Sequence, residues 1–411
     1  MKIPITKPVF DEEDKRAILE PLETGWIVQG PNVKKFEDLF TEFIKVKHAV
    51  ATTSCTTALH LGLLALEIGA GNEVIVPSFT FVATVNALEY CGAKPVFCDI
   101  DLRTFNIDIN MLEEICKRKT QNNKLKAIIP VSLFGLCANM PEICKIAEKY
   151  ELKVLEDAAC ALGAYVSVDR SGNNHLCHAG AFDDGACFSF HPRKSITTGE
   201  GGMFVTNDDR LAWLVRRLRD HGASKSDLER HIEHGGTLLP NYDILGYNYR
   251  MTDFQGALGV SQMKKVDYIL KKRSEMTQRY NDILNDVNVL TTPHVPEGYT
   301  HGCQSYVCLF TGGNDLSGLN LETINSLNVL RNKFMDKLER KGIATRQGTH
   351  AVHTLGYYKK KYNLNDIDYI NSYAADRLSI TLPLYAEMTD EEFEYVTDEI
   401  KAESVMLKAK S

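Results

Sequence analysis

The sequence has few of the features that direct a protein to a membrane or to nucleic acid. Its richest apolar run, Ala58 to Leu66, is interrupted by His60 and is far too short to cross a bilayer. Positive charge is not in excess, because the net charge is -7, so phosphate backbones and anionic lipid surfaces exert no general attraction. The first residues also lack the long apolar core of a signal peptide. We therefore expect neither nucleic acid nor membrane as a partner.

Cysteine is present without the spacing of a disulfide framework. The 11 cysteines are odd in number, scattered, and nowhere arranged as Cys-x-x-Cys. This pattern is typical of a reducing compartment, so we expect a cytoplasmic location. One short group, His175, Cys177 and His178, resembles metal ligands, but the polar run before it, 169–174, predicts a hairpin loop, and we expect no metal site.

The chain does contain enough apolar sequence for a large core. At 411 residues with 44% hydrophobic content, it is long enough for one large domain and a smaller one. Between residues 48 and 206, short β-branched runs alternate with helical patterns, which predicts an α/β fold with a mostly parallel sheet covered on both faces. The predicted strands are His48–Thr52, Glu73–Val76, Pro95–Asp99, Ala127–Val131, Lys153–Glu156, Cys187–Phe190 and Gly202–Thr206.

Helix signals mark the second half of the chain. Two capping-box pairs each predict the start of a helix: Thr252 with Gln255, and Thr389 with Glu392. The first of these helices runs to about Tyr280 and carries the chain out of the large domain, and another, from about Val329, ends at Gly342. We expect a large α/β domain over residues 1–265 and a smaller C-terminal α+β domain over 266–411.

A lysine stands between an apolar strand and a glycine-rich turn, in the run Ser189-Phe190-His191-Pro192-Arg193-Lys194 that leads on to Gly202. A lysine directed toward a buried site loses solvation, its pKa falls, and it becomes a nucleophile able to form an imine with an aldehyde. From the spacing alone, a solvated lysine at a strand end is the more common case.

Two other segments predict ligand contacts at the carboxyl ends of strands. The strand ending at Glu156 and Asp157 would place a carboxylate where parallel sheets bind ligands, and Asp157 could hold a protonated pyridine nitrogen or simply cap the next helix. The hydroxyl-rich helix start after Thr52 has free backbone N–H groups and a favourable dipole. It predicts a phosphate seat with Thr56 and Thr57 as donors.

Taken together, these segments resemble the DegT/DnrJ/EryC1/StrS family of sugar aminotransferases over nearly the whole chain. The matching segments, in the family's order, are Gly25–Ile27 with Gly30, Ser54–His60, Pro77–Thr84, Glu156–Gly163, Ser189–Gly202, Gly246–Met251 and Leu382–Tyr385. The resemblance implies the fold type I, aspartate aminotransferase-like architecture and the cofactor pyridoxal 5'-phosphate (PLP), which alternates with its amino form, PMP.

The resemblance also assigns roles to individual residues. Lys194 matches the lysine that binds the cofactor as a Schiff base and moves the substrate proton, and Asp157 matches the acid on the pyridine nitrogen. Phe81 matches the aromatic plate on the cofactor ring. The matches to phosphate contacts are Thr56, Thr57, Ser189 and Asn248. Asn248 reaches the phosphate in the neighbouring subunit in this family, which implies a homodimer with shared active sites.

Two cysteines depart from the residues that the family often has, and His191 has two possible roles. Cys160 stands where the family often has a glutamine that bonds the cofactor's phenolic oxygen, and a thiol is a much weaker donor. Cys55 stands where the family often has glycine. For His191, a structural or hydrogen-bonding role is favoured over acid–base catalysis, because a proline separates it from Lys194.

The resemblance implies transfer of the amino group of L-glutamate to a nucleotide-linked keto sugar. The sequence motif around Lys194 resembles that of enzymes acting on a 4-keto-6-deoxy sugar, so we favour this acceptor. The reaction would belong to deoxyamino-sugar or surface polysaccharide biosynthesis. The candidate substrate contacts are Gln29, Arg346, His350 and His353, for which solvated loop positions are an equal alternative. Other acceptors that stay open are 3-keto sugars, cyclitols and aromatic precursors. A PMP-dependent sugar dehydratase of this family would carry histidine in place of Lys194, and a non-enzymatic regulator would keep only the fold.

Overall fold

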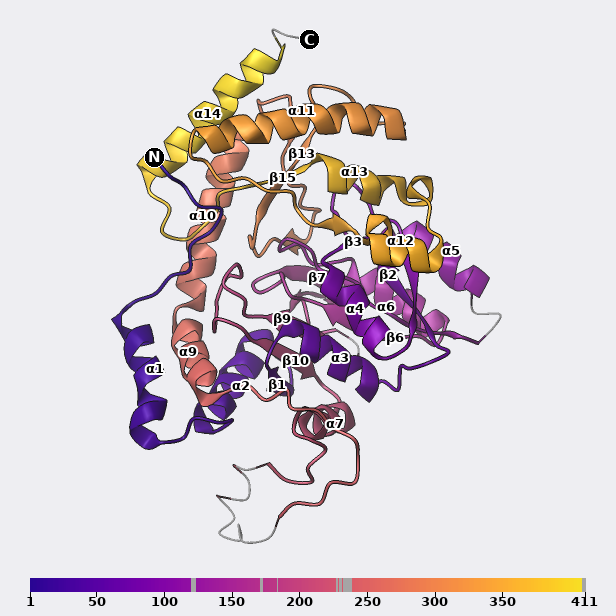
Figure 1. The fold of residues 1–411 in the computed structure, drawn as a ribbon, viewed down its shortest axis with the longest axis vertical. Coiled ribbons are helices and arrows are strands. Elements are labelled where there is room, and N and C mark those ends of the chain that lie inside the picture. The colour runs from indigo at the N-terminus through magenta and orange to yellow at the C-terminus, as the bar shows by residue number, and fades with distance from the viewer. Residues whose placement is uncertain are drawn as a thin grey trace.

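A seven-stranded sheet is the largest sheet of the described residues (Figure 1). The computed structural model describes residues 1–408 apart from 120–122, 171–172, 183, 227, 229–230 and 232–238. The strands, in spatial order, are β1 (His48–Thr52), β10 (Gly202–Thr206), β9 (Gly185–Ser189), β6 (Lys153–Asp157), β5 (Leu125–Ile128), β2 (Glu73–Pro77) and β4 (Lys94–Cys98). β10 is antiparallel to β1 and β9, and the others are parallel. The predicted mostly parallel sheet is confirmed.

Helices cover both faces of this sheet. One face carries α3 (Cys55–Ala65), α4 (Val82–Tyr90) and α7 (Asp209–Arg219), and the other carries α2 (Pro31–Ile44), α5 (Ile109–Lys119) and α6 (Met140–Lys149). The packing follows from side-chain spacing. In α2, Val33, Phe36, Phe40 and Ile44 recur every three or four residues and are all buried, so one apolar stripe faces the sheet.

The C-terminal part of the chain is built on the three-stranded antiparallel sheet β11 (Leu290–Thr291), β13 (Tyr306–Phe310) and β15 (Ser379–Leu382). Its long helices are α10 (Val266–Leu284), α11 (Leu321–Arg340) and α14 (Asp390–Lys408). The N-terminal segment lies on this C-terminal part of the chain, since Ile3 forms a bridge with Ile343 and the Ile5 carbonyl accepts a hydrogen bond from the Leu384 amide. Figure 1 accordingly shows the N-terminus beside α14.

Two helix predictions differ from the structure in extent. The long helix predicted from Thr252 is two helices, α9 (Asp253–Lys264) and α10, because Lys265 leaves helical geometry with φ -113° and ψ 8° and its ammonium pairs with Asp14. The helix predicted from Val329 begins earlier, at the Asn320 cap. Both predicted capping boxes are present.

The polar run 169–174 joins a hairpin, as predicted. β7 (Tyr165–Arg170) pairs antiparallel with β8 (Asn173–His178), and residues 171–172 between them lie outside the described residues. No helix in the described part of the chain is both long and apolar enough to cross a membrane.

Candidate active site

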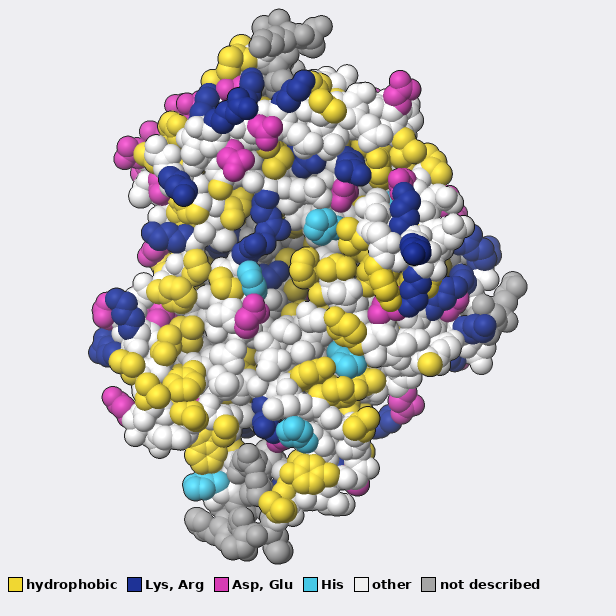
Figure 2. Space-filling view, viewed as in Figure 1, with side chains coloured by type: hydrophobic (Ala, Val, Ile, Leu, Met, Phe, Trp, Pro, Cys, Tyr) yellow, Lys and Arg dark blue, Asp and Glu magenta, His cyan; other side chains and the backbone are white. Residues whose placement is uncertain are grey.

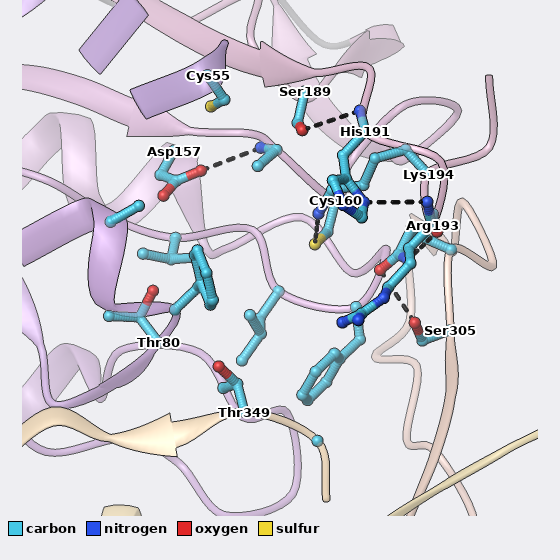
Figure 3. Close-up of a pocket in the computed structure, with 18 of the residues that line it drawn as sticks. Cys55, Thr80, Asp157, Cys160, Ser189, His191, Arg193, Lys194, Ser305 and Thr349 are labelled. Carbon is cyan, nitrogen blue, oxygen red and sulfur yellow. Dashed lines mark hydrogen bonds between the residues drawn. The ribbon is translucent and has the colours of Figure 1, made fainter. Parts of the chain in front are cut away.

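A cavity of about 620 Å³ opens at the carboxyl ends of the parallel strands. Residues at the ends of β6 and β9 form one part of its wall, and Gln304, Arg346 and Thr381 of the C-terminal part of the chain form another. Figure 2 shows this hollow near the middle of the face, and Figure 3 shows the side chains that line it. The position is the one at which parallel α/β sheets bind ligands, and the size suits a small molecule.

One end of the cavity is the N-terminus of α3. Ser54 caps this helix, because its hydroxyl accepts a hydrogen bond from the Thr57 amide at 3.2 Å. The Thr57 hydroxyl in turn accepts from the Ser54 amide, so Thr57 serves the cap, whereas Thr56 lines the cavity with Ser54 and Ser189. Free N–H groups at a helix start favour a phosphate.

A glycine keeps this end of the cavity in shape. An ideal Cβ on Gly202 would lie 2.3 Å from the carbonyl carbon and oxygen of Ser54. Only a residue without a side chain therefore lets the start of β10 approach the turn between β1 and α3.

Asp157 lies at the end of β6, across the cavity from Lys194 (Figure 3). The Thr84 hydroxyl donates to its Oδ2 at 2.7 Å, and the Ala159 amide donates to its Oδ1 at 3.1 Å. Burial raises the pKa of this carboxyl, while the two hydrogen bonds and Lys194 oppose the rise. A buried acid of this kind gains from a cationic partner, which a protonated pyridine nitrogen provides.

Phe81 is the exposed aromatic side chain of the cavity wall. It follows β3 (Phe79–Thr80) and precedes α4, and it is 62% exposed. A phenylalanine of the core would be buried, so this ring is instead available to cover one face of a bound planar group.

Lys194 lies in the turn after β9, where its amide donates to the His191 carbonyl at 2.8 Å. Its Nζ is 3.0 Å from the Cys160 sulfur. Burial acts to lower the pKa of Lys194, but the sulfur of Cys160 and the carboxylate of Asp157 reverse the effect, and the pKa is raised. The fall in pKa expected from the sequence is therefore not found, because Cys160, and to a smaller extent Cys55 and Asp157, stabilise the ammonium.

His191 shapes the same turn. Its Nδ1 accepts a hydrogen bond from the Arg193 amide at 3.2 Å, and burial lowers the pKa of the ring. The neutral ring thereby fixes the backbone next to Lys194, in keeping with the hydrogen-bonding role.

The proposed substrate contacts separate into two groups. Arg346 lines the cavity. Among the described residues, Gln29, His350 and His353 lie outside its wall. His353 is fully buried with its Nδ1 2.6 Å from the Ser78 hydroxyl, and His350 is exposed on the short strand β14 (His350–Ala351). A structural role accounts for His353.

Asn248 is exposed and also lies outside the wall within this single chain. Its backbone pairs with Asp220, and the surrounding segment exposes Leu239, Tyr242 and Leu245. Arg193, Glu200, Gln304 and Ser305 line the cavity but were not predicted from the sequence. Only Arg193 carried a signal, as the cation directly before Lys194.

No metal site is indicated in the part of the chain that the structure describes, where no three His, Cys, Asp or Glu side chains are grouped to hold an ion. His178 is buried and accepts a hydrogen bond from the Gly163 amide at 2.8 Å. Burial lowers the pKa of His178 to about 4, so the ring is neutral and structural.

The comparisons with known proteins agree with this geometry. A sequence profile of the DegT/DnrJ/EryC1/StrS aminotransferase family matches residues 8–401. The chain is 36% identical over 397 residues to GDP-perosamine synthase of Caulobacter vibrioides, with 96% of each chain covered. It is 33% identical over 362 residues to UDP-4-amino-4-deoxy-L-arabinose–oxoglutarate aminotransferase of Shewanella sediminis, covering 88% of this chain and 86% of the relative.

A solved structure shows the same fold. The Streptococcus pneumoniae protein Spr1654, known in a PLP form and a PMP form, superposes in the PMP form with a TM-score of 0.85. Its sequence is 27% identical, and the match covers 99% of this chain and 100% of Spr1654. The phosphate seat, the buried acid, the exposed ring and the lysine described above form a donor set that fits this cofactor.

Proposed function

Because the chain belongs to the DegT/DnrJ/EryC1/StrS aminotransferase family and is a PLP-dependent sugar aminotransferase, we propose that it transfers the amino group of L-glutamate to a nucleotide-linked 4-keto-6-deoxy sugar. The observation that carries the proposal is the cavity in which Lys194 lies across from Asp157, beside the α3 N-terminus. The two similar enzymes support the acceptor class, since their names specify a GDP-sugar and a 4-amino-4-deoxy UDP-sugar.

In this proposal each residue has a separate task. When bound, PLP carries the amino group between the two substrates and withdraws electrons from the bond that breaks. Lys194 holds the cofactor covalently and later moves a proton at the substrate carbon through its Nζ. Asp157 holds the positive charge at the pyridine nitrogen. The α3 N-terminus with Thr56 and Ser189 binds the phosphate, and Phe81 excludes water from one ring face.

The working enzyme in this proposal is a homodimer. Asn248 is exposed in a segment that also exposes three large apolar side chains, Leu239, Tyr242 and Leu245, which are 84%, 56% and 85% exposed. Such a surface is typical of one that another protein covers. A second copy of the chain would bring its Asn248 to the phosphate end of the cavity.

Incubation with L-glutamate and a panel of GDP-, UDP- and dTDP-linked 3-keto and 4-keto sugars tests the function. Mass spectrometry should show the ketone oxygen of a 4-keto member replaced by an amine, together with release of 2-oxoglutarate. Lys194→Ala protein is the control and should form no product.

Other results of this experiment would each identify a different acceptor or a different function. A 3-keto product would move the position of amination. Loss of a hydroxyl without gain of nitrogen would identify a dehydratase. No product from any member would reject the nucleotide-sugar acceptor and favour a cyclitol, and no 2-oxoglutarate with any acceptor would favour a regulator.

A further inference from the structure

Two arginines in the wall of the cavity have no acid partner among the residues that the structure describes. Arg193 is exposed, and within the described part of the chain its guanidinium makes neither an ion pair nor a hydrogen bond. Arg346 is half-buried, and its guanidinium makes only long hydrogen bonds of 3.4 Å to the carbonyls of Gln347 and Gly348. Both charges therefore remain available to a ligand.

The backbone holds both arginines in place. The Arg193 amide donates to the His191 ring, and its carbonyl accepts from the Gln304 amide group at 2.9 Å. Arg346 is fixed from the C-terminal part of the chain, because it forms an antiparallel bridge with Thr381 next to the cavity. The backbone of each arginine is thus held beside the cavity, one in the turn after β9 and one next to Thr381.

The two charges act on one another. The nearby Arg193 contributes to lowering the pKa of Arg346, after burial, and both arginines contribute to lowering the pKa of His191. The acids of the wall are Asp157, which is buried with its own partners, and the exposed Glu200. Figure 2 shows Lys and Arg side chains gathered beside the central hollow, although the whole chain carries a net charge of -7. An anion between the guanidiniums would relieve this repulsion.

We propose that Arg193 and Arg346 form one oxyanion site that serves both substrates in turn, a carboxylate of the amino donor in one half of the reaction and the diphosphate of the nucleotide sugar in the other. The inference rests on the proposed function, which requires both compounds to present their reacting atom to Lys194 in the same cavity. Arg193 directly precedes Lys194 and lies on the same side of the cavity (Figure 3). A guanidinium fork matches carboxylate and phosphate equally well, which makes the shared use chemically sound.

Binding of two unreactive anions to the cofactor-loaded enzyme tests the site directly. Glutarate represents the donor and inorganic pyrophosphate represents the nucleotide diphosphate, and isothermal titration calorimetry measures each alone and in the presence of the other. We expect mutually exclusive binding. Arg193→Gln and Arg346→Gln should each weaken both anions about 10-fold or more. Arg346→Lys should recover part of the loss.

A matched control is Arg210→Gln, because Arg210 forms a surface ion pair with Glu67 outside the cavity and the charge change is the same. This variant should bind both anions as the wild type does. Unchanged thermal unfolding of all variants would show that they fold.

Other outcomes overturn the proposal. Simultaneous binding of both anions, or weakening of only one of them, would reject shared use, and the second result would show which substrate the arginines serve. Unchanged binding of both would reject the site altogether. Because neither probe needs a keto sugar, failure of the proposed acceptor would appear separately, as a missing product with intact anion binding.

Discussion

At the scale of single residues, the contact between Lys194 and Cys160 is the central observation. The Lys194 nitrogen lies 3.0 Å from a sulfur and close enough to Asp157 for that carboxylate to raise the lysine pKa. The surroundings stabilise a positive charge at this place in the cavity. The same surroundings would favour a positive charge on the nitrogen through which Lys194 would hold the cofactor.

The covalent role of Lys194 gives the first prediction. Reduction of the coloured protein with borohydride, followed by peptide mapping, should place the label on Lys194. Lys194→Ala should take up no label and lose about 10³-fold or more of amine transfer, because both the covalent link and the proton carrier are lost. A label on another lysine of the wild type would contradict the assignment.

Glu156, next to Asp157, gives a second prediction through pH. It is fully buried, its carboxylate accepts from Ser132 and the Gly180 amide, and burial raises its pKa to about 7. The unfolded chain loses this proton near pH 4.5 and the folded chain only near 7, so stability falls as pH rises through that window. Glu156→Gln mimics the protonated form and should remove about 2 kcal/mol of the loss between pH 5 and 8.

Urea unfolding of the variant and the wild type at both pH values measures this effect. The difference between the two proteins matters, because desolvation lowers the pKa values of His178, His301 and His353 to about 4. These histidines give the wild type and the variant alike an opposite trend below pH 6.5. Glu391→Gln, on an exposed position of α14, should leave the pH profile unchanged. An unaltered pH profile for Glu156→Gln would mean that Glu156 ionises normally.

The sequence located Lys194, Asp157 and Phe81 because each lies within a long motif at a strand or helix end. It could not separate Arg346 from His353, which lie close together in the sequence. The burial of His353 is decided by its contact with Ser78, 275 residues away in the chain. Arg193 was missed for a related reason. The sequence does not show that its guanidinium is unpaired, because this depends on where the acidic side chains lie in the fold.

At the scale of elements, the approach of β10 to the β1–α3 turn gives a third prediction. Gly202→Ala would place a Cβ 2.3 Å from the Ser54 carbonyl and push apart the turn that holds the phosphate. We expect a destabilisation of about 1–3 kcal/mol and weaker cofactor retention, measured by denaturant unfolding and by absorbance after dialysis.

Gly356→Ala is the matched control for this change. A Cβ on Gly356, at the start of α12 (Gly356–Tyr362), meets nothing within 4 Å. Alanine there should leave stability equal or slightly higher, and cofactor retention unchanged. Equal behaviour of the two variants would show that the close approach at Gly202 does not matter.

The elements themselves were largely predictable, because hydrophobic periodicity and caps are local signals. β1 and β10 have the predicted bounds, and both capping boxes formed. The break at Lys265 was not predictable, since it accompanies a tertiary ion pair with Asp14, 251 residues away in the chain. Local patterns show where a helix starts more reliably than where packing interrupts it.

At the scale of the whole molecule, the shared active sites of the proposed dimer give the fourth prediction. Lys194→Ala and Asn248→Ala should each be poorly active alone. In a two-fold dimer, mixing them would create hybrids in which one site keeps both Lys194 and the partner's Asn248. Activity should then rise to about one quarter of the wild-type value, measured after unfolding and refolding equal amounts together.

A mixture that stays inactive, while each variant dimerises normally in sedimentation, would show that the two residues serve the same site from one chain. Separately refolded variants, combined only afterwards, are the control for exchange during the assay. Their activity should stay low over the time of measurement.

The pairing of Ile3 with Ile343 and of Ile5 with Leu384 sets a condition on how the protein is made. During synthesis the segment around Ile3 leaves the ribosome long before its binding surface exists, and it must stay unattached while more than three hundred residues are added. The large sheet can close in the meantime, because its strands end at residue 206. The cavity cannot, since Arg346 and Thr381 complete its wall. Translation of the last part of the message therefore sets the earliest moment at which a ligand can be held, and a ribosome stalled before β15 would carry a folded sheet with an unfinished cavity.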